Sequence, residues 1–433
     1  MTPLEIGILC TIILFVLLAA SFPVAFSMAV VGFIGFAAIV DLPAAMSMIT
    51  TELYETFMQY SLTVIPLFVL MGQVSFHSGI SKSLFDVAYR WLGHLPGGLA
   101  ISTVGACTAF GAICGSGPAT AATMASVAIP EMKRYNYDPR LSCGSVASGG
   151  GLGMLIPPSV VFIAYALLTE QSIGDLFLAG IIPGLMIAGL FSLVIIVQCR
   201  ANPALGPAGP AFSWRERFVS LTGLLETILL FASVMVGMFM GFFSPTEAAA
   251  VGAAGSMIVA AARGKLNLSM MKQALVETIR TSCMVLFVVA GAVILGRFLA
   301  VTRIPYVLAS WLVGLPLPGW TVMGMIIFFY LLAGSFVDAL ALVLLTIPIF
   351  YPVVLELGYD PIWFGVIIVV VTQMGVITPP VGVNVYVVSG VERDIPLQTI
   401  FQGSMPFLFA LIIAAIILVA VPGISTFLPH LIG

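Results

Sequence analysis

Long apolar segments separated by short polar stretches follow one another along the whole chain. About 20 consecutive apolar residues are enough to cross a bilayer as a helix, so each segment is a candidate span. The pattern predicts an all-α polytopic membrane protein. The segments lie at roughly 6–20, 23–40, 61–77, 97–130, 141–168 and 174–198, and then at 222–241, 246–262, 280–300, 318–353, 362–388 and 402–425.

The fifth segment of each half cannot form one continuous helix. In the first half, the glycines of 149–153 lower helix propensity, and Pro157 and Pro158 remove amide donors and clash with the preceding turn. Pro379 and Pro380 do the same in the second half. Broken backbone at membrane depth is tolerated only where it is buried in protein or lines a polar cavity. We therefore predict two broken spans beside a site.

The two broken segments are copies of one another. Pro379-Pro380 follows Pro157-Pro158 by 222 residues, and Gly375 follows Gly153 by the same interval. The spacing indicates an internal duplication. We expect one repeat over 1–198, a linker over 199–221 and a second repeat over 222–433.

The fourth segment of each half is too long for one span and is interrupted by small or polar residues. The interruptions are Gly115–Pro118 and Gly334–Asp338. Each segment is interpreted as two half-length helices that meet inside the membrane, so we expect re-entrant hairpins at about 97–133 and 317–356. Segments 78–95 and 301–316 are expected to be interfacial arms that lead into the hairpins.

Lysine and arginine residues concentrate on the cytoplasmic side of membrane proteins. If each half crosses five times and each hairpin returns to its own side, 13 of the 15 basic residues share one side, and only Arg297 and Arg303 lie towards the other. Both termini are then expected outside. Five crossings are odd, so the repeats would have inverted topology. The charge count alone does not choose between ten and twelve spans.

The composition excludes several classes of function. The chain is 61% hydrophobic and 8% charged, with a net charge of −3 and no basic patch for nucleic acid. Six cysteines and three histidines are scattered singly, without the spacing of a metal site. Neither a G-x-x-x-x-G-K-[ST] motif for ATP nor an H-E-x-x-H motif for zinc is present. We therefore expect a transporter with no cofactor, and no enzyme.

Hydroxyl, amide and carboxylate oxygens near the breaks and hairpin tips suit a hard monovalent cation. Such residues also have structural roles, because small residues pack membrane helices and Asp338 could cap the helix that follows it. A carboxylate at a hairpin tip is costly without a partner, which favours a site role for Asp338. The sodium candidates are Gly115, Ser116, Gly117, Ser148, Gly151, Gly153, Ser335, Asp338, Thr372 and Gly375.

We expect two sodium sites related by the repeat. One would lie around Ser116 and Ser148, with carbonyls of the first hairpin and of the second broken span, and the other around Asp338 and Thr372 with the first break. The substrate anion would lie between the tips and the breaks, held by amides, hydroxyls, bound sodium or an arginine from elsewhere such as Arg297. The substrate candidates are Ser159, Thr378, Asn384, Pro157, Pro158, Pro379 and Pro380.

The order of several motifs resembles one known family. The motifs are Pro66–Gly72, Gly115–Pro118, Ile156–Ser159, Ser244–Ala250 and Thr378–Pro380. In this order and with the duplication, the chain resembles the large, DctM-like membrane subunit of tripartite ATP-independent periplasmic (TRAP) transporters over essentially its whole length.

The resemblance implies sodium-coupled uptake of an organic anion, a C4-dicarboxylate or another carboxylate, across the bacterial inner membrane. It also implies a periplasmic substrate-binding protein, a small four-span membrane subunit and elevator-like movement in the lipid bilayer. A stand-alone sodium/dicarboxylate symporter of the same architecture is the alternative. A channel would need a continuous polar pore, and an intramembrane aspartyl protease would need a second membrane aspartate besides Asp338.

Overall fold

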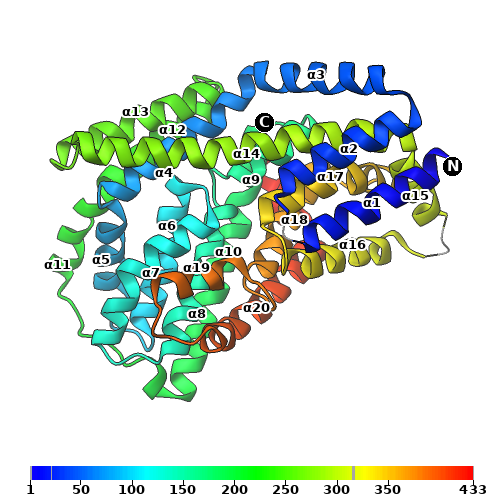
Figure 1. Ribbon diagram of the computed structural model, residues 1–433. Coiled ribbons are helices and arrows are strands. Elements are labelled where there is room, and N and C mark those ends of the chain that lie inside the picture. Colours follow the sequence, from blue (N-terminus) through cyan, green and yellow to red (C-terminus); the bar gives the residue numbers. More distant parts are fainter. Residues whose placement is uncertain (1, 21, 315–316, 433) are drawn as a thin grey trace.

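The computed structural model describes residues 2–20, 22–314 and 317–432, which form helices and connecting turns without a strand (Figure 1). The fold is therefore all-α, as predicted. The α-helices are α1 (Pro3–Ala19), α2 (Val24–Ile39), α3 (Leu42–Met58), α4 (Val64–His77), α5 (Ile80–Leu92), α6 (Gly98–Cys114), α7 (Gly117–Arg134), α8 (Pro139–Gly150), α9 (Val160–Thr169), α10 (Ile173–Ala201), α11 (Trp214–Ser220), α12 (Thr222–Phe239), α13 (Pro245–Ala262), α14 (Leu268–Thr302), α15 (Ile304–Val313), α16 (Gly319–Gly334), α17 (Ala339–Glu356), α18 (Pro361–Gly375), α19 (Val383–Val391), α20 (Leu397–Ala420) and α21 (Gly423–Ile432). Short 3-10 helices are η1 (Tyr60–Thr63), η2 (Gly151–Met154) and η3 (Pro203–Leu205).

Local sequence signals fix where several of these helices begin. Asp138 and Asp360 stand before the prolines that open α8 and α18, and each carboxylate accepts a hydrogen bond from a backbone N–H of the first turn. Ser244 and Glu247 form a reciprocal capping box at the start of α13. These contacts satisfy amides that the first helical turn leaves without a partner.

The helix bounds follow the 222-residue spacing of the sequence. Helix α17 begins and ends 222 residues after α7, and α18 begins 222 residues after α8. The packing is reciprocal as well, because α9 of the first half packs on α17, whereas α19 of the second half packs on α7. The second helix of each broken span thus packs against the hairpin helix of the other half.

The helices divide into two packed groups. The hairpin group consists of α6–α10 and α16–α20, and the scaffold group consists of α1, α2, α4 and α12–α14. In Figure 1, α14 crosses the upper part of the molecule as one long helix beside α2, with the hairpin-group helices α6, α7, α8 and α20 below it. The groups meet where α4 packs on α6 and where α14 packs on α17.

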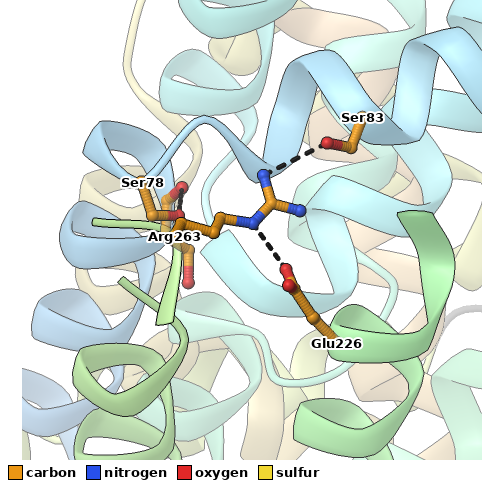
Figure 2. Close-up of polar contacts among 5 residues, drawn as sticks. Ser78, Ser83, Glu226 and Arg263 are labelled. Atoms are coloured by element: carbon orange, nitrogen blue, oxygen red, sulfur yellow. Dashed lines mark hydrogen bonds and ion pairs between the residues drawn. The ribbon is translucent and has the colours of Figure 1, made fainter. Parts of the chain in front are cut away.

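The two arms that the sequence predicts before the hairpins are α5 and α15; residues 315–316 of the second arm lie outside the described residues. Figure 2 shows how α5 is attached to the scaffold group: the Arg263 guanidinium donates to Glu226 of α12 (Nε–Oε2, 2.5 Å) and to Ser83 of α5 (Nη1–Oγ, 3.1 Å). Ser78, also drawn there, donates its hydroxyl to the Ser75 carbonyl at the end of α4.

Some elements differ from the hydropathy pattern. Helix α3 was not predicted, because its polar residues lower the mean hydropathy; Glu52 in this helix accepts a hydrogen bond from Arg297 Nε of α14 at 2.6 Å. Helix α14 starts at Leu268, well before the predicted span at 280, and α11 lies within the predicted linker. Among the described residues, seven helices are long and apolar enough to cross a membrane, and the count of ten spans stays a prediction.

Candidate functional site

A cavity of about 330 Å³ lies where the two helix groups meet. The hairpin group contributes both tips, residues 114–119 and 338–340. The scaffold group contributes Gln73 of α4 and Glu277 and Thr281 of α14, besides apolar neighbours. The cavity therefore has polar groups on both walls and is shared by both halves of the chain.

The first tip is a tight turn between α6 and α7. Gly115 has φ +66°, a left-handed conformation that favours glycine, and Ser116 is the residue before α7. The Gly115 carbonyl accepts a hydrogen bond from Val160 N at 3.2 Å, and a Cβ on Gly115 would lie 2.5 Å from the Pro158 carbonyl oxygen. The first tip is thus held against the break between η2 and α9.

The second tip is longer and carries a charge. Helix α16 ends at Gly334, and Asp338 caps α17 by accepting a hydrogen bond from Leu340 N at 3.0 Å. The Ser335 carbonyl accepts hydrogen bonds from Val381 N (3.1 Å) and Gly382 N (3.3 Å), which hold this tip against the second break. Asp338 therefore caps a helix and also lines the cavity, and the sodium role expected of it stays a prediction.

Each hairpin touches its broken span through a pair of glycines. A Cβ on Gly111 would lie 2.8 Å from Gly153 Cα, and a Cβ on Gly375 would lie 2.5 Å from the Gly334 carbonyl carbon. Real Cβ atoms do not come that close to backbone, so any side chain would push the hairpin and the broken span apart. Gly153 and Gly375, two of the predicted sodium candidates, therefore have a packing role.

A second cluster of polar residues lies away from the cavity, at the crossing of the two broken spans. Ser148, Gln373 and Asn384 are fully buried, and Asn384 Nδ2 donates to the Ala147 carbonyl at 3.0 Å. Ser148 Oγ, both side-chain polar atoms of Gln373 and Asn384 Oδ1 have no hydrogen-bond partner in the described chain. A buried polar atom without a partner costs about 1–3 kcal/mol, so this cluster calls for a ligand or water.

The structure separates the predicted site residues into three sets: those that line the cavity, those in or beside the buried cluster, and those in neither place. Gly115, Ser116, Gly117 and Asp338 line the cavity, whereas Ser148 and Asn384 belong to the buried cluster. Gly151 lies beside that cluster, since a Cβ on it would lie 2.5 Å from Gln373 Cγ. None of the predicted substrate residues is among the described residues that line the cavity: Ser159, Thr378, Asn384, Pro157, Pro158, Pro379 and Pro380.

Several predicted hydroxyls are used locally. Ser159 caps α9, donating to the Met154 carbonyl and accepting from Phe162 N. Thr378 donates to the Met374 carbonyl at 2.7 Å. Thr372 and Ser335 likewise donate to backbone carbonyls three residues before them. Their oxygen lone pairs still allow them to accept or to coordinate a cation.

Three polar lining residues were missed by the sequence analysis, namely Gln73, Glu277 and Thr281. Gln73 stands within a predicted apolar span, which was a usable signal. Glu277 and Thr281 are four residues apart and share a helix face; Glu277 precedes the predicted span at 280–300, and Thr281 lies inside that span but was not singled out. The described lining residues include two carboxylates, Glu277 and Asp338, and no basic side chain. Arg297 points elsewhere, to Glu52.

Comparisons with known proteins agree with the motif order. Residues 11–424 match the family model described as "Tripartite ATP-independent periplasmic transporter, DctM component". The chain is 38% identical to the C4-dicarboxylate TRAP transporter large permease protein DctM of Pseudomonas aeruginosa, over 90% of this chain and 91% of that one. It is 33% identical to the sialic acid TRAP transporter large permease protein SiaM of Vibrio cholerae, over 86% and 87%. In fold it is similar to the YdaH transporter of Alcanivorax borkumensis, with a TM-score of 0.64 and 16% identity over 88% of this chain and 89% of that one.

Proposed function

The chain belongs to the DctM-component family of tripartite ATP-independent periplasmic transporters, and from this premise we propose that it is the subunit that carries an organic anion by sodium-coupled uptake. The substrate class is a C4-dicarboxylate or a related carboxylate, as the names of relatives that are 33–38% identical suggest. A small four-span membrane subunit and a periplasmic binding protein complete the system, and both chain termini lie in the periplasm.

The observation that carries the proposal is the cavity between the hairpin tips and helices α4 and α14. One wall belongs to the hairpin group and the other to the scaffold group. If the hairpin group moves as a body, the tips keep the substrate while the opposite wall changes. This division supports elevator-like transport, in which each inverted repeat would supply one break and one tip.

Sodium explains how an anion is held beside two carboxylates. Glu277 and Asp338 line the cavity without a basic side chain among its described neighbours, so a free carboxylate would be repelled there. Two sodium ions, one bound near the first tip and one near Asp338, would neutralise the charge of these two carboxylates and remove the repulsion. Each positive charge that moves inward across about 100 mV contributes roughly 2.3 kcal/mol, so two sodium ions offset the inward movement of a carboxylate.

The direct test is uptake into proteoliposomes that contain the chain, its small membrane subunit and the cognate binding protein. We expect uptake of at least one carboxylate from a panel, driven by an inward sodium gradient and absent when potassium replaces sodium. Uptake without a sodium gradient would contradict sodium coupling. Uptake that needs no binding protein would instead favour the stand-alone symporter.

A cross-link tests the moving group. A Cβ on Gly72 of α4 would lie 3.2 Å from Cα of Cys114 at the first tip, so Gly72→Cys places a second cysteine against the native Cys114 for oxidative cross-linking. We expect oxidation to stop uptake, reduction to restore it, and sodium binding to persist in both states. The control is Gly72→Cys combined with Cys114→Ala. Normal uptake in the oxidised, cross-linked protein would argue against movement at this contact.

A further inference from the structure

The buried cluster at the crossing of the broken spans is separate from the cavity. Ser148 belongs to α8, Gln373 to α18 and Asn384 to α19. All three side chains have 0% exposure, and each has at least one polar atom without a partner in the described chain. Other buried hydroxyls of the hairpin group, such as those of Ser404 and Ser102, donate to the carbonyl one helical turn earlier. The cluster is therefore unusual within its own group.

Gln373 and Asn384 both contact the stretch of helix that carries Ser148. Asn384 contacts the Ala147 carbonyl, and Gln373 lies against Gly151, so Ser148 lies between their contact points at the end of α8. Residues three and four apart in a helix are neighbours, which brings both amides to the same face of α8. The Asn384 backbone N–H also donates to the Val376 carbonyl at 3.0 Å, close to Gln373 in α18.

The electrostatic surroundings favour a cation over an anion. Helix α8 ends at Gly150 and α18 ends at Gly375, and both C-termini carry partial negative charge, whereas α19 begins at Val383 and brings one partially positive N-terminus beside Asn384. The unpartnered atoms include three oxygens from neutral side chains. Apart from Arg140 in its first turn, α8 has no basic residue, and α18 and α19 have none. Oxygen ligands without a fixed counter-charge suit a hard monovalent ion.

We propose that Ser148, Gln373 and Asn384 bind a sodium ion between the C-terminal ends of α8 and α18. The inference rests on the sodium coupling proposed above and adds a site apart from the hairpin tips. This site has no copy at the 222-residue spacing, because Val370, Gly151 and Phe162 occupy the positions equivalent to Ser148, Gln373 and Asn384. Its ligands come from both repeats, so the ion would hold the hairpin group together wherever that group stands.

Sodium binding to the purified full-length chain tests the site. Radioactive sodium gives the number of ions bound, and thermal unfolding in sodium chloride against potassium chloride at equal ionic strength gives their stabilising effect. We expect Gln373→Met, which keeps the side-chain length, to bind one ion fewer and to lose part of the sodium-dependent shift. Ser404→Ala is the matched control, because it removes a buried hydroxyl of the same group and should leave both readouts unchanged. Unchanged stoichiometry in a folded Gln373→Met protein would show that the cluster holds water only.

A second variant removes the ambiguity of a folding defect. Gln373→Glu keeps the shape and adds a charge, so it should raise sodium affinity about tenfold, the order of a charge-assisted contact. If the cluster binds water only, the same variant should unfold at lower temperature at every sodium concentration. Sodium-driven uptake by the wild-type protein is measured in parallel. If the wild-type protein shows no sodium-driven uptake, the proposed function is refuted. If it does, and sodium binding is unchanged in both variants, only this site is refuted.

Discussion

The two hairpins occupy equivalent places in the duplicated sequence, yet they differ in burial and charge. Most residues of α6 in the first hairpin are buried, whereas α16 in the second has five buried residues and presents a long exposed apolar face. The first tip is a neutral glycine turn, and the second ends in Asp338. The positions at which the helices break are thus preserved in both halves, whereas the first half has the more buried hairpin and the second half has the charged tip.

The largest expected effect comes from the glycine contacts. Gly375→Ala places a Cβ 2.5–2.7 Å from three backbone atoms of Gly334, which cannot move independently. Gly153→Ala places it 2.5 Å from the Thr120 hydroxyl and 2.9 Å from the Ser116 carbonyl. We expect both to destabilise the protein by about 1–3 kcal/mol, with Gly375→Ala the more severe. Thermal unfolding of both variants checks this. If Gly153→Ala lost as much stability as Gly375→Ala, or more, the contact at the second hairpin would relax more easily than its distances indicate.

The charge difference is tested at the tips. Asp338→Asn keeps the side-chain size and an oxygen for the helix cap but removes the charge, so we expect the sodium concentration for half-maximal uptake to rise about tenfold. Ser116→Ala at the neutral tip should raise it less, by about threefold. Surface expression is the control. An unchanged sodium dependence in well-expressed Asp338→Asn would assign Asp338 to capping of α17 alone.

On the scaffold wall, loss of a negative charge is expected to strengthen binding of the organic anion. Glu277→Gln removes one of the two negative charges that line the cavity, so an organic anion should bind more tightly when sodium is limiting, by roughly threefold to fivefold. The gain should shrink at saturating sodium. Calorimetry at two sodium concentrations measures it, with Gln73→Ala as a control that changes the wall without changing its charge. Weaker anion binding in Glu277→Gln would mean that Glu277 itself contacts a positive group.

The smallest effect concerns an ion pair found on one hairpin only. Lys133 near the end of α7 contacts Glu392 just after α19 (Nζ–Oε2, 2.5 Å), and Leu355 occupies the position of Lys133 in the second hairpin. The Lys133 side chain is 44% exposed, so Lys133→Ala should cost about 0.2–1 kcal/mol, and less at high salt. Thermal unfolding at low and high salt checks this. A salt-independent loss would indicate packing by the lysine stem.

The sequence predicted the elements whose signals are local. Consecutive prolines and glycines marked the breaks, and small or polar residues marked the two hairpin tips. It could not separate the cavity from the buried cluster, because Ser148 and Ser116 are alike in type and differ only in the tertiary contacts of their helices. Glu277 was missed for a related reason: its side chain becomes part of a site only because α14 continues past the apolar core.

Helix α14 also indicates which side the cavity faces. Its 35 residues extend about 52 Å at 1.5 Å per residue, well beyond a hydrocarbon layer of about 30 Å. Lys272, Glu277 and Arg280 all lie in its first turns, so that end belongs to the headgroup region and the water beyond it. Glu277 and Thr281, further along α14, line the cavity. If the lysine- and arginine-rich side is the cytoplasm, as the proposed topology has it, the cavity lies towards the cytoplasmic end of α14.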